Sequence, residues 1–582
     1  MSYTGTPPSA KVAIRQREVP QLNESVHENA LLHRILAARG IRHRSEHNFS
    51  LADIPSPDTL PDIEQAVERL LRARDSGERV LIVGDYDCDG ATSTAVAMLG
   101  LEMLGFRQLD YVVPSRFHYG YGLSPPIVEL AVDSYQAQLI VTVDNGVASV
   151  EGVNHAATHS IDVVVTDHHL APDELPAAVA LVNPNLPGAT FEGINLAGVG
   201  VIFYTLMALR SRLKTLDDKH SKAPLVQLLD LVAIGTVADV VPLDNLNRKL
   251  VEQGLRRIRT GHTRPGVLAL LDVAGKTPER ISTQDIGFGI GPRLNAAGRI
   301  DDMRLGVRCL MSKTLEDARL LADELNALNE KRRRIGSEME QEAVEQLAQL
   351  NRNSTHNEDT FGICLKNELW HQGVIGILAG RLKLQENKPV IVFTEDDADH
   401  LKGSARSIAG VHIRDALQNI VARHPGLITK FGGHAMAAGL TLPKASFECF
   451  AAAFNDAIKQ QLNGRHSIRE YLTDGSLSTG ERTLENALLL SNSMPWGQGF
   501  EAPVFFDQFR VLMQKAVGKG HLKMQLQAAD SEQTLDAIAF NQSPVVANRE
   551  WVQVVYSLDA NYFRDTYTLQ LQVQHQQACS LR

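Results

Sequence analysis

Short apolar runs separated by helical stretches organise the first half of the chain. Residues 80–83, 139–143, 162–165 and 231–237 form four continuous runs that are rich in β-branched side chains. Runs of this kind are typical of strands buried on both faces. Strand-like runs that alternate with helical stretches indicate a parallel sheet covered by helices. We therefore predict an α/β domain with four parallel strands at these positions.

Two helical segments flank this domain. Residues 1–72 are polar and helical in character, and a predicted helix at 62–74 ends this N-terminal stretch. From Thr314 to about Leu350 the chain is rich in Leu, Ala, Glu, Gln and Arg, with apolar residues at helical spacing. Thr314 and Asp317 have the spacing of a capping box, so we predict one long linking helix that begins here. Its basic residues 331–334 either face solvent or contact nucleic acid.

The second half of the chain changes texture twice. Apolar runs at 361–365 and 390–393 predict a second α/β region. Residues 522–527 and 567–573 alternate strictly between apolar and polar side chains, which indicates half-buried antiparallel strands. Gly518-Lys519-Gly520 predicts a turn before the first of them. The C-terminal part is therefore expected to form a small β-barrel with an OB-like fold.

These patterns predict five parts. They are a helical N-terminal extension (1–72), a catalytic α/β domain (73–312), a linking helix (313–352), a second α/β domain (353–462) and an OB-like domain (463–582).

Composition narrows the class of protein. The chain has 582 residues, with 44% hydrophobic and 22% charged side chains, as in ordinary soluble proteins. Its five cysteines form no C-x-x-C pair, which argues against a disulfide framework or a thiolate zinc site and fits a reducing cytoplasm. The first twenty residues lack the apolar core of a signal peptide, and no uncharged apolar run approaches the length of a membrane span. The net charge of −10 argues only weakly against nucleic acid, because clustered metal ligands would account for many acids.

Carboxylates and histidines follow each of the four apolar runs directly. Because ligands bind outside the carboxyl ends of strands in open α/β sheets, these groups should share one crevice. Like charges crowded in this way need cations, and carboxylates with imidazole but no thiolate suit Mn²⁺ or Mg²⁺. Paired ions of this type clamp the oxygens of a phosphoryl displacement. The residues concerned are Asp85, Asp87, Asp89, Asp144, Asp167, His168, His169 and Asp239.

Two competing motifs fail on their spacing. Asp85-x-Asp87-x-Asp89-Gly90 also opens an EF-hand loop, but Val96 occupies the twelfth position, where a glutamate is required. Gly275-Lys276-Thr277 suggests a phosphate-binding loop, but Leu270 replaces the glycine that must precede it.

At these residues the sequence resembles a known family. Asp85-Tyr-Asp-Cys-Asp-Gly90, Val143-Asp144-Asn-Gly146, Asp167-His168-His169 and Gly235-Thr-Val-Ala-Asp239 are similar to motifs I to IV of the DHH phosphoesterase superfamily. Further motifs resemble the RecJ family within it. They are Pro114-Ser-Arg116, Gly120-Tyr-Gly122, Gly291-Pro-Arg293-Leu-Asn295-Ala-Ala-Gly-Arg299, Trp370-His371-Gln-Gly373-Val-Ile-Gly376, Ser404-Ala-Arg406-Ser407 and Gly432-Gly-His434-Ala-Met-Ala-Ala-Gly439. One departure is Val83, which stands where phosphatase members of the superfamily often carry a histidine; Asp85 is the expected substitute.

The resemblance implies a parallel-sheet DHH domain, a DHHA1 domain after the linking helix, and a C-terminal OB domain. It implies two divalent ions, Mn²⁺ or Mg²⁺, with Asp144 as the bridging carboxylate. Asp167 would orient a histidine, and His169 would lie near the metals or contact phosphate. The implied activity is exonuclease cleavage of single-stranded DNA, 5′ to 3′, releasing 5′-mononucleotides in DNA repair and recombination. The implied metal ligands are Asp85, Asp87, Asp89, Asp144, His168 and Asp239, and the implied catalytic residues are Asp144, Asp167, His168 and His169.

The remaining motifs suggest strand handling. The resemblance, and no motif of its own, implies a single-strand-binding protein and a helicase as partners. We expect a DNA-binding monomer in the cytoplasm, with no membrane. Tyr121 and Trp370 either stack on bases or pack internally. Gly432 and Gly433 form either an anion-binding nest or a structural turn. Lys515, Lys519 and Lys523 give the barrel a basic edge. The substrate-binding candidates are Arg116, Tyr121, Arg293, Asn295, Arg299, Trp370, His371, Ser404, Arg406, Ser407, Gly432, Gly433 and His434.

Two other functions fit parts of this pattern. A DHH phosphoesterase for short oligonucleotides or nucleotide phosphates would resemble the two α/β blocks but needs neither the long helix nor the barrel. A catalytically inactive DHH scaffold would have no need for the intact acidic and histidine motifs.

Overall fold

The computed structural model describes residues 12–115, 122–353, 359–518 and 520–580. These fall into two units. The larger unit is Arg15–Ala327 with Leu472–Arg582, and the smaller is Met1–Ile14 with Leu328–Tyr471. In the described part of the chain, no helix is both long enough and apolar enough to cross a bilayer.

A parallel sheet forms the centre of the α/β domain in the larger unit. Its strands are β2 (Val80–Val83), β3 (Leu109–Val112), β4 (Leu139–Val143), β5 (Asp162–Thr166) and β6 (Ala180–Val182). They lie in the order β3-β2-β4-β5-β6, and each neighbouring pair is parallel. The strands predicted at 80–83, 139–143 and 162–165 are therefore confirmed, as is the parallel sheet. The sequence pattern missed β3 and β6, because β3 is half-exposed and β6 is only three residues long.

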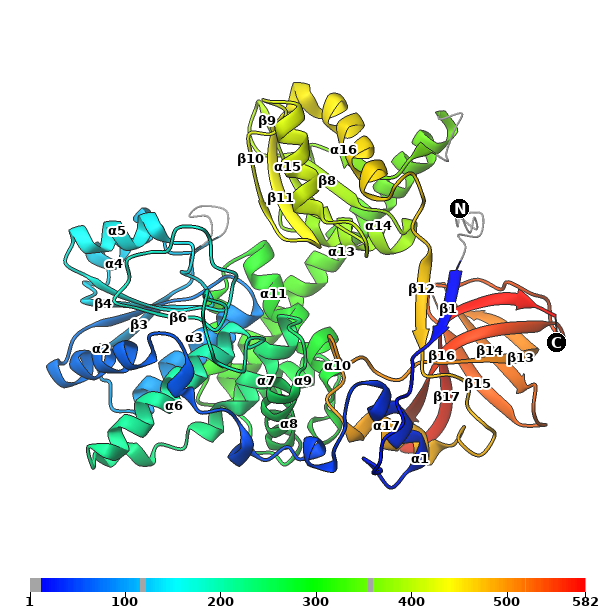
Figure 1. The fold of residues 1–582 in the computed structure, drawn as a ribbon, viewed down its shortest axis with the longest axis horizontal. Helices are drawn as coiled ribbons and strands as arrows, with labels where there is room; N and C mark the ends of the chain where they lie inside the picture. Colours follow the sequence, from blue (N-terminus) through cyan, green and yellow to red (C-terminus); the bar gives the residue numbers. More distant parts are fainter. Residues whose placement is uncertain (1–11, 116–121, 354–358, 519, 581–582) are drawn as a thin grey trace. The chain divides into compact units, whose positions relative to one another are not determined.

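Helices cover both faces of this sheet (Figure 1). On one face, α4 (Pro125–Asp133) and α5 (Val150–Thr158) pack against the apolar side chains of β2, β4 and β5. The helices α2 (Ile63–Ser76), α3 (Cys88–Met103) and α6 (Gly198–Thr215) lie on the other face. The helix expected at 62–74 is thus present as α2.

The fourth predicted strand is wrong, because residues 231–237 lie in helix α7 (Leu229–Ala238). Residues 229–236 of this helix are all buried. A helix buried on every side is apolar on every side, so its sequence lacks the 3.6-residue period and reads like a buried strand. Further helices follow: α8 (Asn245–Arg259), α9 (Pro265–Val273), α10 (Thr283–Asp285), a π-helix (Ile286–Ile290), α11 (Gly291–Ile300) and α12 (Arg304–Met311).

The N-terminal stretch is less helical than expected. It contains α1 (Ala30–Ala38) but also strand β1 (Val12–Gln16), which pairs with β12 (Arg469–Thr473). Arg39, at the end of α1, makes a two-pronged ion pair with Asp474, through contacts of 2.7 and 2.9 Å. Both side chains are only 2% exposed, so the first residues of the larger unit are fastened to its C-terminal part.

The predicted C-terminal barrel is confirmed. Its strands close in the order β13-β14-β15-β17-β16, with a parallel pair between β15 and β17. Side chains of β14 alternate between buried and half-buried, as their sequence predicted. The turn residue Lys519 lies outside the described residues. The elements are α17 (Leu484–Ser493), β13 (Phe505–Val517), β14 (His521–Ala528), β15 (Thr534–Ala539), β16 (Trp551–Phe563) and β17 (Thr566–Cys579).

The smaller unit is built on a mixed sheet in the order β10-β11-β9-β8-β7. The strands expected at 361–365 and 390–393 are present as β7 and β8. The predicted linking helix is also present as α13 (Leu315–Asn353), which continues from one unit into the other. Thr314 caps it by donating to Asp317 Oδ2 at 2.7 Å and accepting from the Asp317 amide at 3.1 Å. The other elements are β7 (Ile363–Lys366), α14 (Ile375–Glu386), β8 (Val390–Glu395), β9 (His400–Arg406), α15 (Ile413–Arg423), β10 (Lys430–Gly433), β11 (Ala437–Pro443) and α16 (Phe447–Gln461).

Candidate metal centre

The acidic and histidine side chains singled out in the sequence meet at the carboxyl edge of the parallel sheet. They come from the loops after β2, β4 and β5, from the first turn of α3, where Asp89 lies, and from the C-terminal end of α7, where Asp239 lies. Three sets of them each offer ligand atoms within 4.8 Å of one another. The sets are Asp85, Asp87 and Asp144; Asp89, His168 and Asp239; and Asp144, His168 and His169.

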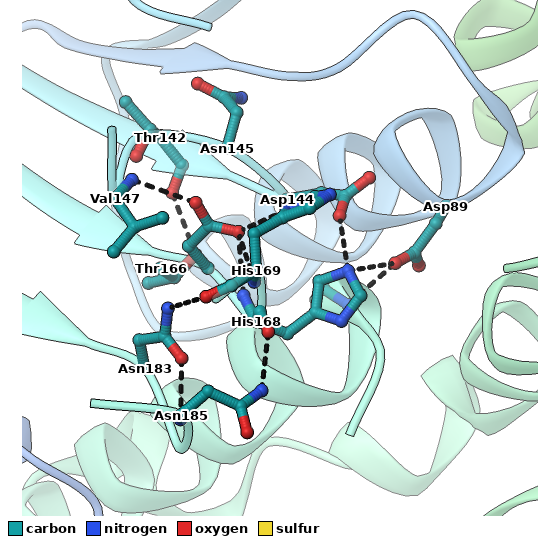
Figure 2. Close-up of polar contacts among 12 residues, drawn as sticks. Asp89, Thr142, Asp144, Asn145, Val147, Thr166, His168, His169, Asn183 and Asn185 are labelled. Atoms are coloured by element: carbon teal, nitrogen blue, oxygen red, sulfur yellow. Dashed lines mark hydrogen bonds and ion pairs between the residues drawn. The ribbon is translucent and has the colours of Figure 1, made fainter. Parts of the chain in front are cut away.

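His168 lies among three of these carboxylates, and Figure 2 shows two of them, Asp144 and Asp89. Its Nε2 is 3.2 Å from Asp144 Oδ1, 3.4 Å from Asp239 Oδ2 and 4.0 Å from Asp89 Oδ2. Asp144 and Asp89 are almost fully buried, at 2% and 1% exposure. One imidazole nitrogen therefore faces several carboxylates from which most solvent is excluded.

The backbone at Asp144 has a left-handed conformation, with φ of 62°. Aspartate tolerates this region better than most residues, and such strained positions cluster at functional sites. The first residue of α6 packs against it closely. A Cβ on Gly198 would lie 2.5 Å from the Cβ of Asp144, so only glycine permits this contact.

Helix α6 also points its N-terminus at Asp89. The amide of Gly198 donates to Asp89 Oδ2 at 2.6 Å, and the amide of Val199 donates to Oδ1 at 3.1 Å. Free amides and the helix dipole both stabilise an anion at this end of a helix. These two donors hold the Asp89 carboxylate in one orientation.

Asp167 occupies the centre of a separate hydrogen-bond network. Its Oδ2 accepts from the Val147 amide at 2.9 Å, and its Oδ1 accepts from the His168 amide at 2.7 Å and the His169 amide at 3.1 Å. Its Oδ1 also lies 2.7 Å from His169 Nδ1. The geometry of Asp167 is therefore that of a group that orients a histidine. Asn183 and Asn185 support the same loop by donating to the carbonyls of His169 and His168 at 2.8 and 2.6 Å (Figure 2).

Burial and neighbouring charges shift the pKa values of these groups in different directions. Burial, together with the neighbouring carboxylates, raises the pKa of Asp144 and of Asp239 well above the usual range, and raises the pKa of Asp89 to about 7. Burial lowers the pKa of His168 to about 4, so its imidazole is neutral.

The pKa values of His169 and Asp167 shift in the opposite directions, upward for the histidine and downward for the aspartate. Burial opposes the charge on His169, but the hydrogen bond and charge of Asp167 prevail and raise its pKa to about 9. Burial alone would raise the pKa of Asp167, yet its contacts with His169 hold that pKa below the ordinary value.

This donor set fits divalent cations. Four or more carboxylates in a mostly buried crevice repel one another unless positive charge is supplied. A neutral imidazole such as that of His168 is the form that binds a metal. Oxygen-rich ligands with imidazole and no thiolate match Mn²⁺ or Mg²⁺. Asp144 contributes to two of the sets, which is the position a bridging ligand needs.

Helix α11 supports the acidic loop that follows β2. Asn295 Oδ1 accepts from the Cys88 amide at 2.9 Å. Gly298 packs so closely that a Cβ there would lie 1.7 Å from the carbonyl oxygen of Tyr86. Arg293 donates to the carbonyls of Gly289 and Val273 at 2.8 and 2.9 Å, and to Asn326 at 3.0 Å, so its guanidinium is engaged within the fold. Arg299 is half-buried near the end of the same helix.

The substrate-binding candidates after α13 all belong to the smaller unit. Trp370 is 4% exposed and donates from Nε1 to Glu342 Oε2 at 2.8 Å, a geometry that favours packing over base stacking. His371 accepts from the Gly373 amide at 3.1 Å, and Ser407 is buried and donates to the Val411 carbonyl at 2.8 Å. Arg406 donates to Ser404 Oγ at 3.2 Å.

The glycine pair in this unit ends an edge strand. Gly432 and Gly433 are the last residues of strand β10, where they pair with Gly439 and Ala438 of β11. They therefore belong to a strand, and an anion-binding role for their amides stays a prediction. His434 is exposed just beyond them. Arg116 and Tyr121 lie outside the described residues.

Several residues around the acids had no side-chain signal in the sequence. Gly198 and Val199 act through their backbone amides, and the identity of a residue does not indicate such a role. Asn183 and Asn185 follow β6, a strand that the pattern missed. A polar pair directly after a short apolar run was the only available indication of them.

Comparison with known proteins extends this description. Residues 79–236 match the DHH family N-terminal domain, 359–460 the DHHA1 domain and 473–575 the RecJ OB domain. The chain is 46% identical over 572 residues to the single-stranded-DNA-specific exonuclease RecJ of Escherichia coli, covering 96% of this chain and 98% of that one. The RecJ of Bacillus subtilis is 33% identical over 90% of this chain and 65% of its own length.

A solved structure shares this fold. RecJ of Thermus thermophilus in complex with Mn²⁺ superposes with a TM-score of 0.81 at 26% identity, covering 98% of this chain and 80% of that one. The same protein has been solved with Mg²⁺, with a TM-score of 0.75 at 25% identity. From its domains, its relatives and its fold, this chain belongs to the RecJ family of the DHH superfamily.

Proposed function

We propose that the chain is a single-stranded-DNA-specific exonuclease that hydrolyses phosphodiesters with two divalent ions and releases 5′-mononucleotides in the 5′ to 3′ direction. The observation that carries this proposal is the cluster of carboxylates with His168 at the carboxyl edge of the sheet. The names and the metal content of the relatives support it. Its biological setting would be DNA repair and recombination.

The protein's own residues would divide the work between two cation positions. Asp85, Asp87 and Asp144 would hold one ion, and Asp89, His168 and Asp239 the other, with Asp144 shared between them. Bound Mn²⁺ or Mg²⁺ supplies an activated water and neutralises the charge that develops on the phosphate. The amides of Gly198 and Val199 keep Asp89 oriented, and the neutral Nε2 of His168 stays available as a ligand.

His169 has a different role in this proposal. Its hydrogen bond to Asp167 favours the protonated imidazole, which can contact a phosphate oxygen. Asp167 holds the ring through Nδ1, and Nε2 is the atom that we propose donates to substrate. His169 therefore supplies a positive charge, whereas His168 supplies a neutral ligand.

Strand handling is assigned to the other parts of the chain. The OB domain implies single-stranded DNA as the bound partner. Arg406 and Ser404, which lie against Gly376 at the start of α14, are the proposed contacts for the 5′-phosphate. A single-strand-binding protein and a helicase are the proposed protein partners of a monomeric enzyme. All five cysteines are free thiols, which supports a cytoplasmic location.

The test compares a linear single strand with a closed circle of the same sequence, in the presence of Mn²⁺. We expect the linear strand to be degraded to mononucleotides from its 5′ end and the circle to survive. Removal of the 5′-phosphate should slow the reaction, and Arg406→Ala should reduce that dependence on phosphate. Cleavage of the circle at the linear rate would show an endonuclease instead. Activity confined to oligonucleotides of a few residues would favour the small-substrate phosphoesterase, and inactivity in Mn²⁺ and Mg²⁺ would favour a scaffold.

A further inference from the structure

A second group of metal-ligating side chains lies on the outer layer of the α/β domain, on helices α4 and α5. It consists of Glu129 from α4, His155 from α5, and His159, which caps the C-terminal end of α5. We propose that these three residues bind a Zn²⁺-class cation, at a site chemically distinct from the acidic cluster. Nothing in the proposed nuclease reaction requires this site.

The geometry converges on one carboxylate oxygen. Glu129 Oε1 lies 2.5 Å from His155 Nε2 and 3.5 Å from His159 Nε2. The two imidazole rings are 5.1 Å apart, and ligand atoms of all three residues lie within 4.8 Å of one another. His155 and His159 are four residues apart, so helical spacing places both on one face. A small shift of the Glu129 carboxylate would open a position that faces all three ligand atoms.

The donor set differs from that of the catalytic cluster. Two imidazoles and one carboxylate match the ligands of open zinc sites, in which three protein groups leave a fourth position for water. The acidic cluster offers mainly oxygen, which suits Mn²⁺ or Mg²⁺. Zn²⁺, Ni²⁺ and Cu²⁺ all bind imidazole strongly, and Zn²⁺ is the ion that the carboxylate and the open position favour. The side chains are 30 to 49% exposed, so an ion reaches them from solvent.

The scaffold around this site is already ordered. Ile127 and Val128 of α4 and Val153 and Ala156 of α5 pack in one apolar core with the sheet below. At the other end of the helix pair, the Leu123 amide donates to Ser149 Oγ at 3.1 Å. Ion binding would therefore require side-chain movement alone. A bound cation would link the C-terminal halves of α4 and α5. The contact of Leu123 links only their N-terminal ends.

The test measures Zn²⁺ bound per chain by equilibrium dialysis, followed by metal quantification, on full-length protein. We expect the wild-type chain to bind one more equivalent than His155→Ala, His159→Ala or Glu129→Ala. Loss of one direct ligand should weaken binding at this position by at least the roughly 10- to 100-fold that loss of an outer partner costs. The matched control is His400→Ala, which removes a histidine paired with a single carboxylate, Asp397, at 3.0 Å. Because the acidic cluster is unchanged in every variant, each should keep its Mn²⁺-dependent cleavage.

A second measurement separates this site from the acidic cluster directly. Cu²⁺ held by iminodiacetate has too few open positions for a carboxylate cage but binds two adjacent imidazoles. Besides the amine nitrogen of the chelator, we expect its electron paramagnetic resonance spectrum to show two coupled imidazole nitrogens in wild type and in His400→Ala, and one in His155→Ala. Equal Zn²⁺ stoichiometry in wild type and variants, or a single coupled imidazole nitrogen in wild type, would overturn the proposal. Neither result depends on whether the chain is a nuclease.

Discussion

The contact between α11 and the loop after β2 gives the sharpest test of how the site is assembled. Gly298 packs against the backbone of Tyr86, which is the residue between Asp85 and Asp87. A Cβ at residue 298 would be 1.7 Å from the Tyr86 carbonyl oxygen and 2.9 Å from its carbon. Both atoms belong to the backbone, so no side-chain rotation relieves the clash. In Gly298→Ala the two segments must separate by about 1.7 Å to reach an ordinary contact of 3.4 Å.

The expected loss of activity follows from this displacement. Movement of the loop carries the carboxylates of Asp85 and Asp87 away from Asp144. A misplacement of about 1 Å at a catalytic group typically costs about 100-fold in rate, so we expect kcat to fall by at least about 100-fold. Overpacking should cost about 1 to 3 kcal/mol of stability, partly offset by about 1 kcal/mol from the better helix propensity of alanine. The chain should therefore stay folded while cleavage collapses.

The assay is single-turnover cleavage of a labelled single strand at saturating Mn²⁺, with circular dichroism as the check on folding. Gly287→Ala is the matched control, because a Cβ there meets only Val237 Cγ1 at 4.0 Å. This variant should stay within about threefold of wild type, since open positions tolerate an added methyl group. If Gly298→Ala kept more than about a third of the wild-type kcat, the argument that α11 fixes the acidic loop would be refuted.

Three further predictions test other parts of the site. Asp144→Asn should abolish metal-dependent cleavage and shrink the thermal shift produced by Mn²⁺, but keep the fold, because asparagine also accepts the left-handed backbone; full activity would rule out a bridging role. Trp370→Phe should lower stability by about 1 kcal/mol through loss of its hydrogen bond to Glu342, and the affinity for single-stranded DNA should not change. A large loss of affinity would instead show that Trp370 stacks on a base. Lys515 and Lys523 are cross-strand partners in the barrel, and replacing both by alanine should reduce the slope of log affinity for single-stranded DNA against log salt concentration by about 1.4. The control replaces the exposed residues Lys214 and Lys219 of the α/β domain. Equal slopes in the two double variants would exclude DNA contact at the barrel edge.

The sequence predicted the positions of the acids better than the elements that carry them. The runs before Asp85, Asp144 and Asp167 were correctly predicted as strands, because β-branched residues buried on both faces leave an unbroken apolar pattern. Asp239 was grouped with them because its run was predicted as a fourth strand. That run is a helix, yet its C-terminal end still places Asp239 beside Asp89 and His168.

The rest of the site could not be predicted because it depends on backbone groups and packing. The amides that hold Asp89 belong to an apolar helix start, and the close approach of Gly298 depends on where α11 packs. The burial of Arg293 and Trp370 likewise depends on tertiary contacts, so motif context alone suggested ligand roles for two side chains that the fold itself engages.

The interlocked ends of the larger unit have a consequence for how the chain is made. Arg39 finds its buried partner Asp474 across 435 residues, and Asn29 meets Asn486 at 3.1 Å across 457. At a synthesis rate of about 5 to 20 residues per second, roughly 20 to 90 seconds pass between the emergence of α1 and that of Asp474 from the ribosome. The parallel sheet needs only residues up to 182 and can form much earlier. Folding of the first segment is therefore tied to the end of translation, so a chain that stops short of the barrel leaves its own N-terminus unfinished.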